Sequence, residues 1–581
     1  MIFEDAHWVD PTSLEVFSRT VDRIEALPVL LVVTFRPEFD PPWVGRAYVT
    51  ALTINRLTER EARAMIDRIV GNKPLPPSIR EDVVERSDGI PLFIEEMTKA
   101  VLEAESQHAA ELTVGAVPSP ALAVPASLHA SLMARLDRLG PAKDVAQVGA
   151  AIGREFSHAL LAAVARKPES ELSSALDRLI QSGLLFRQGV PPHANYLFKH
   201  ALVQDAAYGT LLREPRRALH ARIVETLGSE FAEIAESQPE LMARHCTEAG
   251  FVEEAVDYWE RAGRQALGRS AMAEAVAQLT KGLEVLESLS SGPEHQRREI
   301  NLQLVMGPAL IAAKGFASPE AMRAYARARE LCRGLGDVSD VFPALYGQSV
   351  FHFQRGELVA ANELAQELLR LAEERGEVGA QVTGHRLLGA TLSQLGRLTE
   401  SRDHFTAALG LYDPVRDRSS AFVYAVDSRV ISLSWLSHVF AVLGYPKEAA
   451  GSDGEAPAHA RELNHPNTMA VALVLSCMFH QLLRDTPNAR SQAEAVIALA
   501  TEQDFPFYLA AGTAVRGWVL AEGGRAEEAV MEIRRGAVDY GATGAQLWSP
   551  YFLGLLAEAQ GKAGQATTGL SVGLGSRCSH T

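Results

Sequence analysis

Most of the chain repeats one pattern of apolar and polar positions. From about residue 216, apolar residues recur at helical spacing in segments paired across short turns. The later turns follow one another at intervals of 40 residues, with a single interval of 48, and they fall at Gly356, Gly396, Gly444, Arg484, Gly524 and Gly564. A fixed period with a small residue at most turns is typical of stacked helical hairpins. Residues 216–565 are therefore predicted to form a helical-repeat solenoid.

One repeat, around Gly396, has the spacing of a tetratricopeptide repeat. Its small and large apolar positions are Leu388-Gly389, Leu392, Phe405 and Ala408, and Pro414 closes it. The period exceeds the usual length of about 34 residues, which predicts longer helices or loops. After Gly564 the helical pattern fails. Residues 566–581, rich in Gly and Ser, are predicted to be a frayed or aberrant tail.

Residues 1–105 alternate strand and helix patterns instead. They follow in the order strand 1–3, helix 14–27, strand 28–34, strand 51–54, helix 57–69 and helix 77–87. The run at 28–34 is β-branched and apolar throughout, as in a parallel strand buried on both faces. This order predicts the C-terminal part of an α/β nucleotide-binding module of the P-loop NTPase class, followed by a helical lid.

Two segments with different patterns follow in the middle of the chain. Residues 106–125 are rich in Ala, Pro, Val and Ser without a period, which predicts a linker. Residues 126–215 show three helices, short strands at 184–187 and 196–199 around a turn at 189–195, and a further helix. Helices followed by one hairpin indicate a winged-helix-like domain. The predicted fold class is therefore mainly α, with a partial α/β module at the start.

Composition narrows the class of protein. Hydrophobic residues make up 47% and charged residues 22% of the 581 residues, which is typical of a globular chain. The formal net charge of −16 disfavours a general nucleic-acid binder. No apolar run approaches the roughly 20 residues of a membrane span. The four cysteines show no zinc or disulfide spacing, so we expect free thiols in a reducing cytoplasm.

Two adjacent carboxylates, Glu4 and Asp5, follow the first predicted strand. A nucleotide hydrolase needs one carboxylate for the Mg²⁺ shell and another to polarise the attacking water. On this interpretation Glu4 serves the metal and Asp5 the water, and the following HW-x-D-P-x-S-L favours it. The alternative is an exposed pair of acids at the start of the chain.

Two further positions are candidates for nucleotide contact. Arg36 follows the apolar strand, and strand ends in open α/β sheets point at the ligand crevice, so Arg36 can sense a γ-phosphate. The alternative is a surface arginine before a proline turn. Gly89 and Pro91 lie between two helical segments and suit a lid contact on the nucleotide base. The alternative is an ordinary turn between helices.

The phosphate-binding pattern GxxxxGK[ST] does not occur in residues 1–581. Without its amide cradle and lysine, we expect this chain not to hydrolyse ATP at a useful rate. An in-frame GxxxxGK[ST] in the DNA upstream of Met1 would show that the start codon was misplaced. In the winged-helix-like segment, the recognition helix at 168–181 carries Glu169, Glu171, Asp177 and Arg178, and this net acidic surface would repel DNA.

The motifs together resemble the signal-transduction ATPases with numerous domains. Within that class they resemble bacterial multidomain proteins that combine a class III adenylate cyclase, an AAA-type ATPase and tetratricopeptide-like repeats. The matching segments are EDAHWVDPTSLE, TFRPEF, DGIPLFIEEM, LMARLDRLGPAKDVAQVGAAIGREF, YLFKHALVQDAAYGTLL and CTEAGFVEEAVDYW. The resemblance implies that Glu4 and Asp5 are Walker B acids, that Arg36 is a sensor, and that Gly89 and Pro91 contact ATP. It also implies Mg²⁺ as cofactor and a protein partner on the repeats.

Three functions follow from these observations. The first is a truncated regulatory member of this ATPase family, cytoplasmic and without its cyclase and its phosphate-binding loop. The second is a non-enzymatic scaffold that binds a protein or peptide on the concave face of the repeats. The third is a winged-helix transcription regulator, which the acidic recognition helix disfavours.

Overall fold

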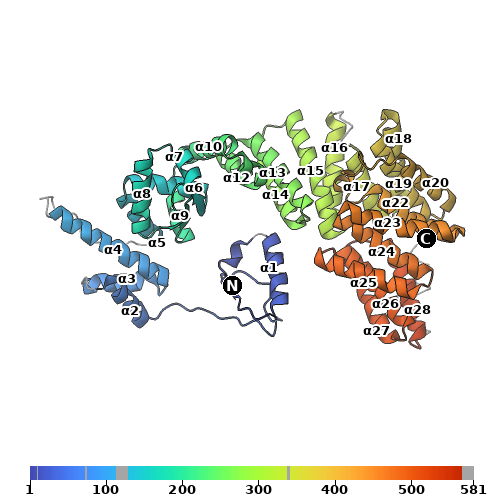
Figure 1. Cartoon of the computed structure of the whole chain (residues 1–581), viewed down its shortest axis with the longest axis horizontal. Coiled ribbons are helices and arrows are strands. Elements are labelled where there is room, and N and C mark those ends of the chain that lie inside the picture. The colour runs from blue at the N-terminus through green and yellow to red at the C-terminus, as the bar shows by residue number, and fades with distance from the viewer. Residues whose placement is uncertain (10, 26, 72–74, 113–127, 336–340, 566–581) are drawn as a thin grey trace. The chain divides into compact units, whose positions relative to one another are not determined.

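The computed structural model describes all residues except 10, 26, 72–74, 113–127, 336–340 and 566–581, and it is mainly helical (Figure 1). The chain forms two compact units. The N-terminal unit comprises residues 1–7 and 18–255, and the repeat unit comprises residues 8–17 and 256–581. The contacts therefore divide the chain near residue 255, whereas the sequence pattern suggested divisions near 105 and 215.

A two-stranded parallel sheet lies at the start of the chain. Strand β1 (Ile2–Phe3) pairs with β2 (Val32–Val33), and helix α1 (Pro11–Ile24) connects them. Parallel pairing was predicted, but burial on both faces was wrong, since Ile2 is 71% and Leu30 is 77% exposed. In the described part of the chain no other strand joins this sheet, so its apolar faces lack the cover that parallel strands normally receive.

The strand predicted at 51–54 does not form, and Leu52 and Ile54 are almost fully exposed. An isolated apolar segment cannot form a strand without a neighbour to complete its hydrogen bonds. The helices that follow agree with the pattern and are α2 (Glu59–Val70), α3 (Pro77–Ser87) and α4 (Pro91–Leu112). Thr58 and Glu61 form a capping box that fixes the start of α2. Buried Ile66, Val83 and Met97 join the three helices in one core.

The predicted linker overlaps helix α4, which continues to Leu112, and its residues 113–125 lie outside the described residues. Next come α5 (Leu128–Arg138), α6 (Pro141–Ile152), β3 (Glu155–Ser157), α7 (His158–Ala165), α8 (Glu169–Gln181), β4 (Leu185–Gln188), β5 (Asn195–Phe198) and α9 (Ala201–Gly209). The predicted hairpin is confirmed, and β3 was missed. The three strands form an antiparallel sheet in the order β3-β5-β4. Phe156 stacks on Tyr196 across it, with ring centroids 5.8 Å apart.

The N-terminal unit ends with α10 (Arg213–Glu230), α11 (Ala232–Ser237), α12 (Pro239–Ala249) and the first residues of α13 (Val252–Gly268). Helix α10 packs against α6 and α7 as well as α12. This packing explains why the division predicted at residue 215 is absent: α10 continues the core of the preceding helices rather than opening the repeats.

The repeat unit stacks helix on helix in chain order (Figure 1). Its further helices are α14 (Met272–Leu286), α15 (Pro293–Lys314), α16 (Pro319–Leu335), α17 (Val341–Gln354), α18 (Leu358–Arg375), α19 (Val378–Gln394), α20 (Leu398–Leu411), α21 (Ser420–Val423), α22 (Ser428–Leu443), α23 (Pro446–Leu463), α24 (Pro466–Leu482), α25 (Thr486–Glu502), α26 (Pro506–Glu522), α27 (Ala526–Ala542) and α28 (Ser549–Lys562). The predicted helical-hairpin repeats are confirmed. The predicted tail at 566–581 lies outside the described residues.

Each of the six predicted turns contains a left-handed residue at the predicted position. Five are glycines, with φ between 75° at Gly356 and 88° at Gly444, and the sixth is Arg484 with φ 57°. Glycine adopts this conformation without a steric cost, which explains the periodic signal. The longer interval of 48 residues arises between α20 and α22, where residues 412–427 form a long connection that contains the short helix α21.

The stack closes on itself within the repeat unit. Helix α15 contacts α26, and the rings of Phe316 and Phe507 meet edge to face with centroids 5.5 Å apart. The carbonyl oxygen of Gln354 accepts hydrogen bonds from the backbone N–H groups of Gln546 (2.8 Å) and Leu547 (2.9 Å). Early and late hairpins are therefore in direct contact.

The cysteines and the apolar helices bear on two expectations from composition. Cys246, Cys332 and Cys477 are buried free thiols, and Cys578 lies outside the described residues. Across the helices that the structure describes, none has both the length and the apolar content that crossing a bilayer requires.

Candidate functional site

Glu4, Asp5 and Arg36 lie at one edge of the two-stranded sheet. Strands β1 and β2 run parallel with Phe3 beside Val33, so the residues that follow them leave on the same side. The Asp5 N–H donates to Oγ1 of Thr34 at 3.0 Å, and Asp5 adopts a left-handed φ of 57°. The structure thus brings the two carboxylates and the arginine-bearing turn to the same edge of the sheet.

The environment of these side chains is open. Glu4 and Arg36 are exposed, and the Asp5 carboxylate lies 3.7 Å from a guanidinium nitrogen of Arg154, with both side chains more than two-fifths exposed. An ion pair this exposed contributes at most about 1 kcal/mol to stability. No sequence pattern marks Arg154, which directly precedes the unpredicted strand β3.

Gly89 has a structural role that accounts for its residue type. It has a φ of 70°, and its carbonyl accepts a hydrogen bond of 2.7 Å from the N–H of Leu57. A Cβ atom there would lie 2.3 Å from the Leu57 carbonyl oxygen, so only glycine allows this approach. Pro91 is the first residue of α4, where its missing N–H costs nothing. These contacts favour the alternative of a turn between helices.

The residues present do not fit Mg²⁺-ATP. Residues 1–581 contain no GxxxxGK[ST] loop to cradle phosphates, and the Asp5 carboxylate faces a guanidinium. Among the described residues no group of three or more His, Cys, Asp or Glu side chains could hold a metal ion. No catalytic step can therefore be assigned to Glu4 or Asp5 in this chain.

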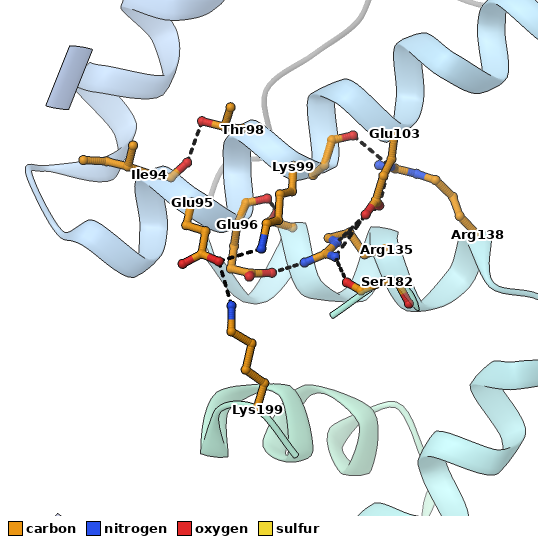
Figure 2. A network of polar contacts seen from close by, with 12 residues as sticks. Ile94, Glu95, Glu96, Thr98, Lys99, Glu103, Arg135, Arg138, Ser182 and Lys199 are labelled. Atoms are coloured by element: carbon orange, nitrogen blue, oxygen red, sulfur yellow. Dashed lines mark hydrogen bonds and ion pairs between the residues drawn. The ribbon is translucent and has the colours of Figure 1, made fainter. Parts of the chain in front are cut away.

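A buried polar network connects α4 to the following domain (Figure 2). The Arg135 guanidinium on α5 forms an ion pair with Glu96 on α4, and both side chains are only 1% exposed. Arg135 also donates to both carboxylate oxygens of Glu103 (3.1 and 3.2 Å) and to the carbonyl of Ser182 at the end of α8 (2.6 Å). One guanidinium thus holds three helices. In the sequence, Arg135 is a charged residue on the apolar helix face defined by Leu132 and Leu136. This signal could have identified the network but was not among the predictions.

Glu95 extends this network to the hairpin side of the domain (Figure 2). Its carboxylate accepts hydrogen bonds from Lys99 (2.5 Å) and from Lys199 (2.7 Å), which follows β5. Burial raises the pKa of Glu95, but the two lysine hydrogen bonds outweigh burial and lower the pKa to about 2. The charged form of Glu95 is therefore the one that the folded state stabilises.

A second buried polar cluster joins α9, α10 and α12. Nδ1 of His220 lies 2.9 Å from Nδ1 of His245, and both side chains are fully buried. The Tyr208 hydroxyl lies 2.9 Å from Nε2 of His220 and donates to Glu248 at 3.2 Å. Burial lowers the pKa of His220 to about 4 and, together with the neighbouring His220, that of His245 to about 3.

The closed stack of the repeat unit encloses a cavity of about 50 Å³. Side chains from α17, α19, α22, α24 and α26 line it, together with residues just after α15 and just before α28. Most of its lining is apolar, and the exceptions are Gln354, Arg386 and Thr391. The cavity thus combines apolar walls with one charged group, the guanidinium of Arg386.

This chain is similar to known proteins at low sequence identity. No family model matches it. It is 29% identical over 476 residues to the protein called "Uncharacterized protein R02095" of Rhizobium meliloti, an alignment that covers 81% of this chain and 46% of that protein. The chain thus spans less than half the length of the curated relative that it matches.

Two solved structures are also similar. A signal-transduction ATPase with a tetratricopeptide repeat sensor from Pyrococcus horikoshii matches with a TM-score of 0.35 and 14% identity, over 93% of this chain and 80% of that one. A Rap protein in complex with competence and sporulation factor matches with a TM-score of 0.41 and 15% identity, over 63% of this chain and 93% of that one. Both TM-scores are low, so the helical-repeat architecture rests on the helix contacts of this chain itself.

Proposed function

We propose that this chain is a regulatory protein of the signal-transduction ATPase type, associated with adenylate cyclases, and that its tetratricopeptide-like repeats bind a protein partner. The observation that carries the proposal is the continuous stack of helical hairpins from α14 to α28. Stacked hairpins offer a large surface made of many similar elements, which suits recognition of another chain. The motifs that resemble the family lie ahead of this stack, in the family's order.

The partner proposal is tested with a photo-reactive amino acid placed at exposed positions in the full chain. Val359 on α18 and Met531 on α27 are 68% and 65% exposed, and Val190 in the hairpin turn of the N-terminal unit is a matched control at 76%. We expect one protein to be cross-linked in the source cell from Val359 or Met531 and not from Val190. Cross-links from Val190 alone would contradict the proposal.

For the nucleotide, we propose that Glu4 and Asp5 are the Walker B acids of an ATPase module, that Arg36 is its sensor, and that Gly89 and Pro91 border the nucleotide. ATP and Mg²⁺ would bind only where a phosphate-binding loop is also supplied. The purified chain is therefore expected to release no phosphate from ATP in a malachite-green assay. Turnover that Asp5→Asn abolishes would overturn this expectation.

Residues 126–215 are proposed to form a winged-helix-like domain that follows movements of the lid. The antiparallel sheet and the preceding helices support the assignment, and the acidic helix α8 disfavours DNA as its ligand. Because Arg135 joins α4 to α5 and α8, a displacement of the lid would carry into this domain. A displacement confined to α4 would first have to break the buried Glu96–Arg135 pair.

The second candidate function is a non-enzymatic repeat scaffold, which the missing phosphate-binding loop favours. Titration calorimetry with Mg²⁺-ATP separates it from the first. The scaffold predicts no heat of binding, and the ATPase-type proposal predicts binding once a phosphate-binding loop is fused ahead of Met1. Aromatic side chains leave only a small cavity in the interior of the stack, so a protein partner of either candidate would contact its outer surface.

A further inference from the structure

The cavity of the repeat unit has walls drawn from distant parts of the chain. Phe316, Tyr346, Trp435, Phe507 and Trp548 supply aromatic surface, and each is at most 6% exposed. The closure between Gln354 and residues 546–547 holds the late wall against the early one. The pocket is preformed, and its volume of about 50 Å³ limits a bound molecule to a few non-hydrogen atoms and excludes a chain segment.

Arg386 on α19 is buried in this cavity without a counter-ion. It is 2% exposed, and no carboxylate of the described residues lies within ion-pair distance of its guanidinium. Its Nε and Nη2 atoms are buried and have no hydrogen-bond acceptor in the part of the chain that the structure describes. The guanidinium lies over the ring of Tyr346, 4.9 Å from the centroid, which stabilises the cation only in part.

An arginine cannot relieve such burial by losing its proton, because its pKa is too high. Proteins rarely leave a buried charge without a partner, and each such group calls for an explanation such as a bound ion. Nε and Nη2 form one edge of the guanidinium fork, which matches the two oxygens of a carboxylate. The indole Nε1 of Trp548 and Oε1 of Gln354, which line the same cavity, are also buried without partners in the described residues.

We propose that the repeat unit binds a small organic carboxylate in this cavity. The carboxylate would pair with Nε and Nη2 of Arg386, and a short apolar body would contact the aromatic walls. A single cation among apolar side chains suits a monoanion better than a phosphate, which carries more charge and needs more donors. This ligand is additional to the protein partner proposed above, so failure of the cross-linking experiment leaves it intact.

The test is binding of defined carboxylates to the full chain in chloride-free buffer. Calorimetry and thermal denaturation are run with acetate and propionate, and with acetamide and propionamide as uncharged counterparts of the same shape. We expect acetate or propionate to bind and to raise the melting temperature by several degrees, and the amides to bind at least tenfold more weakly. Binding by chloride alone, or equal binding of acids and amides, would overturn the proposal.

Variants locate the site. Arg386→Met is expected to abolish carboxylate binding, and Arg370→Met, which removes an exposed arginine of the adjacent helix α18, is expected to leave it unchanged. Where Arg386→Met does not fold, Arg386→Lys and Trp548→Phe replace it, since the first keeps the charge but removes the guanidinium fork and the second keeps an aromatic ring but removes the indole donor. Each is expected to weaken binding at least tenfold. Carboxylate binding that survives all these changes would place the ligand elsewhere and refute the assignment.

Discussion

At the residue scale, the buried histidine pair has only one arrangement of protons that satisfies its contacts. Tyr208 uses its hydroxyl proton on Glu248, so Nε2 of His220 must carry a proton and donate to the Tyr208 oxygen. Nδ1 of His220 then accepts a hydrogen bond from Nδ1–H of His245. Nε2 of His245 is left unprotonated and without a partner in the described structure. The pair is therefore neutral in the folded state.

This neutrality predicts the acid sensitivity of the N-terminal unit. In the unfolded chain both histidines titrate near pH 6.5, whereas in the folded chain their pKa values are about 4 and about 3. Their contribution is complete above pH 6.5 and is lost as the pH falls from 6.5 toward 4, because only the unfolded state takes up protons there. At about 1.4 kcal/mol per pKa unit, we expect a loss of about 3 kcal/mol for one histidine by pH 4.

Urea denaturation of the N-terminal unit's transition at pH 7, 5.5 and 4 measures this slope. His245→Phe removes one titrating group and should flatten the slope in this window. Glu95 acts in a lower pH range than the histidines. Because its pKa is lowered, its contribution to stability is lost only as the pH falls from 4.5 toward 2. A slope that His245→Phe leaves unchanged would show that other groups cause the sensitivity.

The Arg135 network yields a second prediction at this scale. Arg135→Met leaves the fully buried Glu96 carboxylate without its partner, so we expect a loss of about 3–5 kcal/mol in the free energy of unfolding. The double variant Glu96→Met with Arg135→Met should lose less, because no charge stays buried. Arg63→Met breaks an exposed pair with Glu59 in the same unit and should cost less than about 1 kcal/mol. Equal losses of unfolding free energy in all three variants would mean that burial of the ion pair does not determine the cost of breaking it.

At the element scale, the repeat turns were predictable because their conformation selects a residue type. Glycine marks five of the six turns, and each has a positive φ. Arg484 broke the glycine pattern but kept the spacing, and its side chain reaches Glu522 (3.4 Å) and Glu558 (2.5 Å), contacts that offset the strained backbone. The strand β3 was missed since three residues carry too little pattern, and the strand at 51–54 was predicted from a local pattern that lacks a partner strand.

A pair of glycine substitutions tests the role of turn conformation. Nothing lies within 4 Å of a Cβ atom at Gly524 or at Gly451, so both sites have room for alanine. Gly524 has φ 81°, and Gly524→Ala is expected to destabilise the repeat unit by about 1–2 kcal/mol. Gly451 lies inside helix α23, and Gly451→Ala is expected to stabilise it by about 0.5–1 kcal/mol. Opposite shifts in the urea midpoint would confirm the argument, and equal shifts would contradict it.

At the scale of the whole molecule, sequence periodicity predicted the stack but not its closure. The contacts of Phe316 with Phe507, and of Gln354 with residues 546–547, join segments nearly 200 positions apart. Period and turn type are local properties and carry no information about how far the stack curves. The burial of Arg386 could not be predicted for the same reason, because the residues that surround it come together only when the stack closes. Glu4, Asp5 and Arg36 lie at one edge because each follows a strand of the same parallel pair, and strand ends can be read from sequence.

Because the stack is closed, we expect a destabilising substitution at one end to destabilise the helices at the other end as well. Phe507 is 3% exposed and contacts Phe316, Tyr540 and Trp548. Phe507→Ala is expected to cost about 3–5 kcal/mol and to speed hydrogen exchange in α15 as well as in α26. Hydrogen exchange with mass spectrometry measures both effects. Faster exchange in α26 alone would show that the two ends are not coupled.

Closure also limits how this protein can change in length. An open array of repeats can gain or lose a hairpin at little cost, because each repeat contacts only its neighbours. Here the carbonyl of Gln354 must meet the N–H groups of Gln546 and Leu547 after a set number of intervening hairpins. Adding or removing one 40-residue period would move these groups apart and open the cavity. Insertions are therefore expected to be tolerated only in exposed turns such as residues 523–525, and the number of hairpins is a fixed property of the chain.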